Sequence, residues 1–282
     1  MARATAIGPD SSIIRTGLAL VGAWALVTGL SGCASTPTEA EEVPPAEALY
    51  QRGLTQMDAG KILWVFPSGD EAEAIETFQQ IIDNYPYSEH AVSAELKIAD
   101  AYYAQGKYDE ALSYYRDFSE LHPQHASVPY ALSHAALCHY QQSKSPDRDQ
   151  TATTEAIKYL DQLIARHPHS AEAREGEQMW KELRTKLAQH DMQIADFYMD
   201  RDEFQSAADR YRGVLNEYPG LGLDAEALYK LGVCYTEMNL EDEAHKIFEV
   251  ILQNYRGTDV AAAAADRMPE GEAPADQIPS AN

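Results

Sequence analysis

The chain has 282 residues, of which 22 are basic and 45 acidic, so its formal net charge at pH 7 is −23. A surface this acidic argues against a nucleic-acid partner and against electrostatic docking on anionic lipid. Three cysteines in a chain of this length make no disulfide framework.

The first 32 residues have the composition of a secretory signal peptide. Arg3 and Arg15 supply positive charge, and the stretch from Thr16 to Gly32 is uncharged and rich in Leu, Ala and Val. This apolar run is shorter than the ~20 residues that a membrane-spanning helix needs. We therefore interpret residues 1–32 as a cleaved signal peptide.

The signal ends in Leu30-Ser31-Gly32-Cys33, which resembles the bacterial lipobox. In that motif the cysteine sulfur takes a diacylglycerol, the preceding peptide bond is cut, and the new amino terminus is acylated. We therefore predict a lipid on Cys33; the alternative is a plain signal peptide with an incidental cysteine. Several acyl chains anchor a protein stably, since each buried CH₂ contributes about 0.8 kcal/mol. Ala34 in place of an aspartate indicates the outer membrane.

Residues 33–45 are predicted to be a flexible linker. They carry three prolines, several acids and no aromatic side chain, so they cannot bury enough apolar surface to fold. The linker would hold the folded part off the membrane surface.

From residue 46 to about residue 257 the chain repeats one helical pattern. A small residue is followed by bulky residues four and seven positions on and by a proline twelve positions on. The copies are Ala74-Phe78-Ile81-Pro86, Ala111-Tyr115-Phe118-Pro123, Ala156-Leu160-Leu163-Pro168, Ala207-Tyr211-Val214-Pro219, and Ala244-Phe248-Ile251 with Arg256 in place of proline. The small residue lets a neighbouring helix approach closely, and the proline ends its helix.

Each of these helices has an upstream partner that ends at a turn. The partners contain Ala99, Tyr102 and Gly106 in one unit, and Gly232, Tyr235 and Asn239 in another. Together the two helices resemble the tetratricopeptide repeat (TPR), so we predict an all-α solenoid of five such units over residues 46–257. A generic α-helical bundle is the alternative. Ser88 and Ser170, two residues after a proline, are predicted to be N-caps.

Three segments interrupt the regular spacing. Lys61–Gly69 is an apolar insertion, which we expect to tuck under the first repeat rather than to bind a partner. Ser143–Thr151 is a polar loop. Ala171–Asp200 contains 14 extra residues, close to four helical turns, and is predicted to be one helix. Its expected apolar face consists of Trp180, Leu183, Leu187, Ile194 and Tyr198.

Residues 258–282 are predicted to form a short capping helix, beginning at Thr258 or Asp259, and a disordered acidic tail from Pro269.

Signals of catalysis or metal binding are poor. The folded part has no H-E-x-x-H, no G-x-S-x-G, no phosphate-binding loop and no paired cysteine motif. His134 and His139 are five residues apart, on different faces of a helix, and Cys138 and Cys234 lie in apolar helical patterns where we expect them buried. We therefore expect no enzyme activity, no metal and no cofactor other than the lipid on Cys33.

The whole layout resembles the BamD family, lipoproteins of the outer-membrane β-barrel assembly machinery. The motifs that carry the resemblance are Leu49-Tyr50, Tyr85-Pro86-Tyr87-Ser88, Ala94–Leu112, Leu121-His122-Pro123-Gln124-His125, Tyr130, Asp147-Arg148-Asp149, Arg166-His167-Pro168-His169-Ser170, Leu187-Ala188, and Tyr198 with Arg201. The resemblance implies a periplasm-facing scaffold on the outer membrane. Its C-terminal repeats would bind the barrel-forming assembly protein, and its N-terminal repeats would bind unfolded outer-membrane protein precursors.

A stripe on the first helices of the first three repeats suits such precursors, whose ends are rich in aromatic residues. The candidate groove residues are Tyr50, Leu54, Met57, Leu96, Asp100, Tyr103, Leu137 and Tyr140. The alternative for each residue is packing between repeats. Two other functions remain open: a TPR lipoprotein adaptor for an envelope protease or for cell-wall and division enzymes, and a hydrolase within a helical scaffold.

Overall fold

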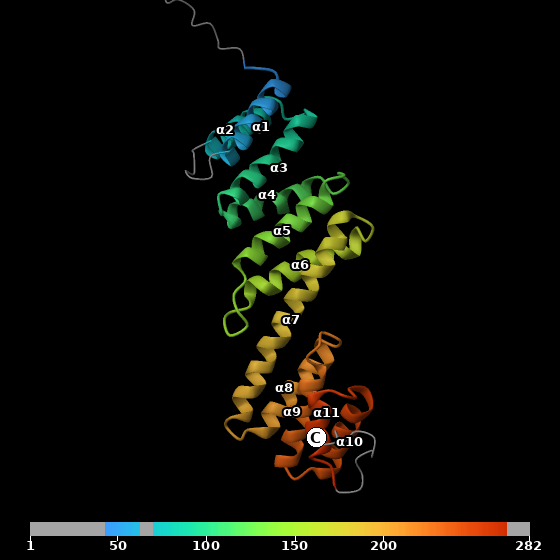
Figure 1. Cartoon of the computed structure of the whole chain (residues 1–282). Coiled ribbons are helices and arrows are strands. Elements are labelled where there is room, and N and C mark those ends of the chain that lie inside the picture. Colours follow the sequence, from blue (N-terminus) through green and yellow to red (C-terminus); the bar gives the residue numbers. More distant parts are fainter. Residues whose placement is uncertain (1–42, 63–69, 270–282) are drawn as a thin grey trace, which may run out of the picture. The chain divides into compact units, whose positions relative to one another are not determined.

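A computed structural model describes residues 43–62 and 70–269, all of them in the compact unit that begins at Val43. The described residues form helices and no strand (Figure 1). The helices are α1 (Ala46–Ile62), α2 (Asp70–Asn84), α3 (Glu89–Ala104), α4 (Tyr108–Leu121), α5 (Val128–Gln142), α6 (Thr151–Arg166), α7 (Ala171–Met199), α8 (Phe204–Glu217), α9 (Asp224–Glu237), α10 (Glu241–Asn254) and α11 (Asp259–Ala265).

Each helix packs against the next one along the chain, which pairs α1 with α2 and so on to α9 with α10. The first helices of consecutive units are also in contact: α1 contacts α3, and α5 contacts α7. The connections α2–α3, α4–α5 and α6–α7 lie along one edge, on the right in Figure 1. This architecture confirms the prediction of an all-α stack of tetratricopeptide-type units.

The helix ends follow the local sequence. The Ser88 hydroxyl accepts a hydrogen bond from the His90 amide at 3.2 Å, and the Ser170 hydroxyl accepts one from the Ala173 amide at 3.0 Å. Both predicted N-caps are therefore confirmed. The Thr258 hydroxyl caps α11 in the same way, through the Ala261 amide at 3.2 Å.

In the second, fourth and fifth units the turn between the two helices contains a left-handed residue. Gly106 has a φ of 72°, and Asn239 has a φ of 60°, which confirms both predicted turns. Asp202, with a φ of 60°, occupies the same place in the fourth unit and was not predicted. The amide that follows each turn residue reaches back to a tyrosine carbonyl, as Glu203 does to Tyr198 at 3.0 Å, and this satisfies the end of the helix.

Glycine permits close helix contact in the first and fifth units. A Cβ on Gly232 would lie 2.5 Å from the Phe248 ring, and one on Gly53 would lie 2.6 Å from the Phe78 ring. Sixteen residues separate the first pair and 25 separate the second, and the difference equals the nine residues of Lys61–Gly69. The insertion concealed the role of Gly53 in the sequence pattern.

Helix α7 is one helix of 29 residues, as predicted, and it contributes to two hydrophobic cores. Leu183 belongs to the core formed with α3–α6, and Ala188, Met192 and Ala195 belong to the core formed with α8 and α9. Four residues of the predicted apolar face pack on these two cores, namely Trp180, Leu183, Leu187 and Tyr198. Ile194 belongs to neither core and, partly buried, lines a surface pocket with Tyr198. The reason is that α8 and α9 cover the face that contains Met192 and Ala195.

At the C-terminal end α11 covers the last repeat. Ala261, Ala264 and Met268 are buried against α10. None of the described helices is long and apolar enough to cross a membrane. The predicted signal peptide, Cys33, residues 63–69 of the insertion and the tail from residue 270 lie outside the described residues.

Candidate functional site

The predicted groove residues come from the first helices of three consecutive units. Tyr50, Leu54 and Met57 lie on α1, Leu96, Asp100 and Tyr103 on α3, and Leu137 and Tyr140 on α5. Seven of them are partly exposed. Leu96 is 7% exposed and packs inside the core formed by α3–α7, so it is not available to a partner.

The α1 residues are half packed and half accessible. The Tyr50 ring meets the Phe78 ring edge-on, with 5.7 Å between centroids, and lies 5.3 Å from the His90 ring. Leu54 and Met57 pack partly on the same core. One face of each side chain therefore fixes its rotamer while the other remains open, an arrangement that lowers the entropy lost when a ligand binds.

Asp100 links three helices through hydrogen bonds and is not a free carboxylate on the surface. Its carboxylate accepts hydrogen bonds from the hydroxyls of Tyr115 and Tyr130, each at 2.7 Å, and from Lys97 Nζ at 2.6 Å. Its side chain is 13% exposed. Burial and the Asp100 carboxylate raise the pKa of Tyr115 and of Tyr130, so both hydroxyls remain protonated donors. Asp100 thus ties α3 to α4 and α5.

Tyr103 lies in a cluster of aromatic rings between α3 and α5. It meets Tyr108 at 5.4 Å and His134 at 6.1 Å, both edge-on, and its hydroxyl accepts a hydrogen bond from Gln141 at 3.2 Å. His134 stacks on Tyr130 at 3.9 Å, and burial lowers its pKa, which keeps the ring neutral at pH 7. The rings of this cluster are therefore uncharged at pH 7.

Tyr140 continues the stripe toward α7. Its hydroxyl donates to Glu182 Oε1 at 3.1 Å, and Lys186 Nζ lies 5.8 Å from its ring centroid. Leu137 is half-buried on the same helix. The stripe is therefore bounded on the α7 side by charged residues.

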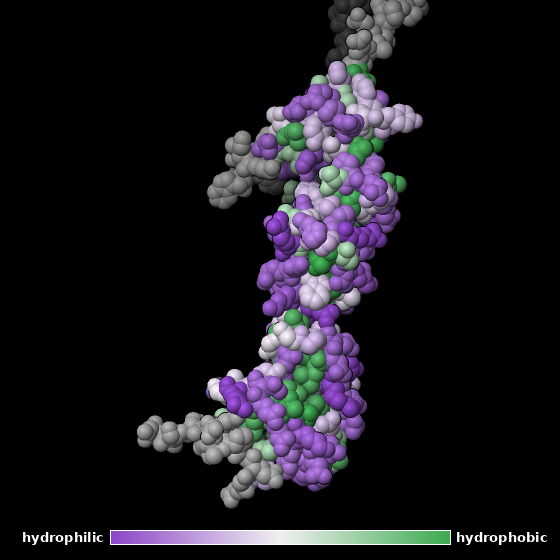
Figure 2. Space-filling view, turned by 90° about the vertical axis from the view of Figure 1, so that its right-hand side faces the viewer, coloured by the Kyte–Doolittle hydropathy of each residue, from purple (hydrophilic) through white to green (hydrophobic). Residues whose placement is uncertain are grey.

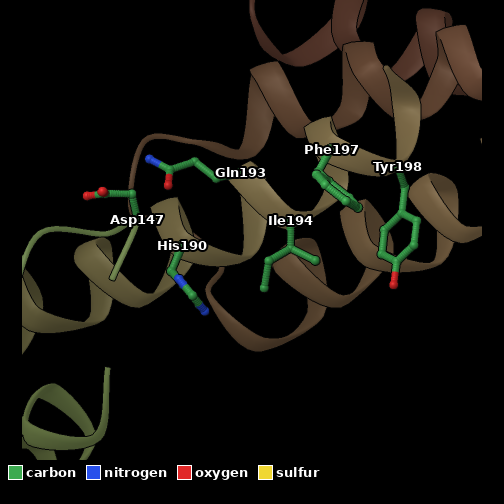
Figure 3. A pocket seen from close by; sticks show the side chains of 6 residues that line it. All are labelled: Asp147, His190, Gln193, Ile194, Phe197 and Tyr198. Atoms are coloured by element: carbon green, nitrogen blue, oxygen red, sulfur yellow. The ribbon is translucent and has the colours of Figure 1, made fainter. Parts of the chain in front are cut away.

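A pocket of about 360 Å³ lies along the second half of α7 (Figure 3). Its lining consists of Asp147, from the α5–α6 loop, and of His190, Gln193, Ile194, Phe197 and Tyr198 from α7. In Figure 3 His190, Ile194 and Tyr198 project from α7 in the same direction. The pocket follows from the length of α7, whose second half extends past the core shared with α3–α6.

The α5–α6 loop that borders this pocket has its own polar core. Gln150 is buried, and its side-chain amide donates to the carbonyls of Ser145 at 2.7 Å and Arg148 at 2.9 Å. The loop is fastened to α7 by His190, whose Nδ1 lies 2.6 Å from the Pro146 carbonyl. The sequence indicated a polar loop, but the buried glutamine was not predicted.

Phe197 is the exposed aromatic residue of the pocket. Half of it, 51%, is exposed, and the Arg201 guanidinium lies 3.6 Å from its ring centroid. An exposed aromatic ring with a cation stacked on it offers both apolar area and positive charge. This suits an apolar partner segment that also carries a carboxylate.

Asp196, next to the pocket, is a second junction that the sequence did not reveal. It accepts hydrogen bonds from the Tyr211 hydroxyl at 2.5 Å and from Lys230 Nζ at 2.8 Å. Lys230 also pairs with Glu226 at 2.8 Å. The junction joins α7 to α8 and α9, so the surface around Phe197 rests on a fixed support.

The part of the chain that the structure describes has no group of three His, Cys, Asp or Glu side chains that could hold a metal ion. Cys138 and Cys234 are buried, as expected from their apolar surroundings, and no disulfide joins them. Burial raises the pKa of Cys138 to about 12 and that of Cys234 to about 11. Neither thiol is therefore an activated nucleophile.

Comparison with known proteins finds relatives that match most of this chain. The relatives include the outer membrane protein assembly factor BamD of Caulobacter vibrioides, 29% identical over 233 residues, which cover 83% of this chain and 73% of that protein. They also include the protein of the same name from Rickettsia prowazekii, 28% identical over 232 residues, covering 82% and 89%.

Similar solved structures include repeat proteins. A tetratricopeptide repeat protein from Parabacteroides merdae is 16% identical with a TM-score of 0.36, and the match covers 79% of this chain and 88% of that one. A family model described as an outer membrane lipoprotein, YfiO, matches residues 44–265. Because that match spans most of the chain and all of α1–α11, this chain belongs to the YfiO family of outer membrane lipoproteins.

Proposed function

We propose that this chain is a non-enzymatic scaffold of the β-barrel assembly machinery at the bacterial outer membrane. The observation that carries the proposal is the family match over residues 44–265, together with relatives that are named outer membrane protein assembly factors. A stack of helical repeats offers long surfaces for other proteins and needs no cofactor to do so. The lipid on Cys33 is the one attached group in this proposal.

In this proposal the lipid on Cys33 anchors the chain to the outer membrane. The predicted lipobox precedes residues 33–45, which lead into α1. We place the chain on the periplasmic side of the outer membrane, held by acyl chains on Cys33.

The two ends of the repeat stack take different partners. The N-terminal repeats bind unfolded outer-membrane protein precursors along the aromatic stripe of Tyr50, Leu54, Met57, Tyr103, Leu137 and Tyr140, with Asp100 as the support beneath it. The half-packed, uncharged rings of this stripe support the assignment.

The C-terminal repeats bind the barrel-forming assembly protein. Phe197 with its stacked Arg201 and the firm Asp196 junction support a protein-binding surface there. Figure 2 shows hydrophobic residues gathered over the C-terminal repeats on the face it displays. Hydrophobic patches of this kind are typical of protein-binding surfaces.

The test separates the two ends. A Met57→Ala, Tyr103→Ala double variant should weaken the binding of a peptide from the end of a β-barrel precursor by about 1–3 kcal/mol, because aromatic anchors dominate such contacts. Co-purification with the barrel-forming protein from detergent-solubilised membranes should be unchanged. Phe197→Ala is the matched control. It should weaken co-purification with the barrel-forming protein and leave the binding of the precursor peptide unchanged.

Helix content by circular dichroism must be the same in all variants. If the double variant releases the barrel-forming protein and keeps the peptide, the two ends are assigned the wrong way round. If wild-type protein co-purifies with an envelope protease or a cell-wall enzyme and with no barrel protein, the scaffold assignment itself is wrong.

A further inference from the structure

Three exposed apolar side chains lie at the N-terminal end of one edge of the repeat stack. Tyr87, in the α2–α3 connection, is fully exposed, Leu121, at the end of α4, is 70% exposed, and Val43 is 43% exposed. We name these three residues the linker edge. Figure 2 faces this edge and shows it to be mostly hydrophilic, with isolated hydrophobic residues in the N-terminal repeats.

The start of the folded chain is tied to the same edge. The Tyr85 hydroxyl donates to the carbonyl oxygens of Val43 at 3.1 Å and Pro44 at 3.0 Å. Tyr85 closes α2, two residues before Tyr87. The point at which the linker joins the folded repeats is therefore fixed beside the most exposed aromatic residue of the described chain.

The linker is short. Ten residues separate Val43 from Cys33, and ten residues span at most about 36 Å even when fully extended. If Cys33 carries a lipid in the membrane, as the proposed function requires, Val43 cannot lie farther than this from the lipid anchor, and Tyr85 holds Val43 beside the α2–α3 connection.

We infer that the linker edge contacts the surface of the lipid bilayer that holds the Cys33 lipid. The linker would then not hold the first repeats off that surface, as its composition alone suggested. Tyrosine suits the boundary of a bilayer, because its ring is apolar and its hydroxyl stays hydrated. Leucine and valine beside it add apolar area without adding charge.

The size of the patch favours lipid over protein. Three scattered side chains fall far short of the roughly 800 Å² that each partner buries in a stable protein interface. A chain already tethered to the bilayer meets it at a high effective concentration, so a weak contact is enough to orient the first repeats.

The charges around the edge indicate which lipid it meets. Glu47 pairs with His90 at 2.8 Å and Glu95 pairs with His122 at 3.0 Å, so the histidines here are matched by acids. A contact made by apolar side chains among acids should be with zwitterionic headgroups and should be insensitive to salt.

The test uses full-length lipidated protein in vesicles of dioleoylphosphatidylcholine. A nitroxide is attached at Tyr87→Cys or Leu121→Cys; the native Cys138 and Cys234 are buried and should not react. Lys107→Cys is the matched control, because Lys107 is exposed in the same repeat but lies in the α3–α4 turn at the opposite edge. The readout is the ratio of collision rates with oxygen, which enters lipid, and with a water-soluble nickel chelate.

The ratio should be several-fold higher at residues 87 and 121 than at residue 107, and raising the salt concentration should not lower it. Equal ratios at all three positions, in protein that floats with the vesicles, would overturn the inference and leave the anchor intact. Wild-type protein that does not float would overturn the anchor and the inference with it. Shielding of residue 87 from both reagents only when the barrel-forming protein is added would show a protein contact instead.

Discussion

Lys230 on α9 reaches into the preceding repeat and places its Nζ 2.8 and 3.1 Å from the two carboxylate oxygens of Asp196 on α7. Asp100 is the counterpart of Asp196 two repeats earlier. Each aspartate follows a buried alanine and accepts a hydrogen bond from a tyrosine 15 residues on, Tyr115 or Tyr211. Each also accepts a hydrogen bond from the first helix of the next repeat, from Tyr130 on α5 or from Lys230 on α9. The same hydrogen-bonded arrangement therefore links consecutive repeats at two places in the stack.

Removing the Asp100 carboxylate should be costly. We expect Asp100→Ala to lower the free energy of unfolding by about 2–3 kcal/mol, because the hydroxyls of the buried Tyr115 and the half-buried Tyr130 lose a charged acceptor. Asp196→Ala should cost less, about 1 kcal/mol, since the Asp196 side chain is 40% exposed. Urea unfolding followed by circular dichroism measures both.

Asp117→Ala is the matched control for these two variants. Asp117 pairs with the exposed Arg116, so its loss should change stability by no more than about 0.5 kcal/mol. Equal losses for Asp100→Ala and Asp117→Ala would contradict the structural role of Asp100.

The glycine in the fifth repeat should not tolerate a methyl group. Gly232→Ala places a carbon 2.5 Å from the fully buried Phe248 ring, and we expect a loss of about 1–3 kcal/mol from overpacking. Gly213→Ala, inside α8, has nothing but the backbone of its own helix near the new carbon and should stabilise the protein by up to about 1 kcal/mol. A thermal melt of both variants suffices, and a Gly232→Ala protein as stable as wild type would refute the close contact.

Alkaline pH should unfold the protein through its tyrosines. Burial and the carboxylate of Asp191 raise the pKa of Tyr218 to about 12, and burial and Asp196 raise the pKa of Tyr211. Unfolded tyrosines lose their protons near pH 10, whereas these keep theirs in the folded state. The folded state then binds more protons, so stability is complete below about pH 10 and falls as the pH rises beyond it.

The check is the urea midpoint measured from neutral pH to about pH 12. A Tyr218→Phe variant cannot ionise at that position, so its midpoint should fall less steeply above about pH 10, whatever its stability at neutral pH. A wild-type midpoint that stays constant across this range would show that the buried tyrosines ionise as freely as in the unfolded chain.

Anchoring by Cys33 has a simple consequence in cells. A Cys33→Ala protein should carry no lipid and should leave the membrane fraction unless a partner holds it there. Mass spectrometry of the mature wild-type protein should find the lipid on Cys33. Detection of an unmodified Cys33 at steady state would rule out the lipobox.

Local features of the fold were predictable from the sequence, and contacts between distant residues were not. The N-caps Ser88 and Ser170, the turns at Gly106 and Asn239 and the continuous α7 depend on a few neighbouring residues, and the structure confirms each one. Local chemistry decides such features because caps, turns and prolines act within one helical turn.

The roles of Asp100 and Leu96 needed the structure. A helical pattern in the sequence tells which residues share one face of a helix. It does not tell which other helices cover that face, because this depends on the turns between repeats. Asp100 finds its partners 15 and 30 residues away, and Leu96 turns into the core. Ile194 is the opposite case, since it matches the apolar spacing of α7 and nevertheless lines a surface pocket.

The length of α7 sets both the distance and the relative rotation between the repeats on either side of it. In a straight helix each added residue shifts the next repeat by about 1.5 Å and turns it by about 100°. The 14 additional residues amount to nearly four whole turns, so they increase the separation of the flanking repeats with little change of phase. A relative whose α7 differs by a full turn would keep the two surfaces proposed to bind partners facing as they do here, at another distance. A difference of one or two residues would point them in different directions.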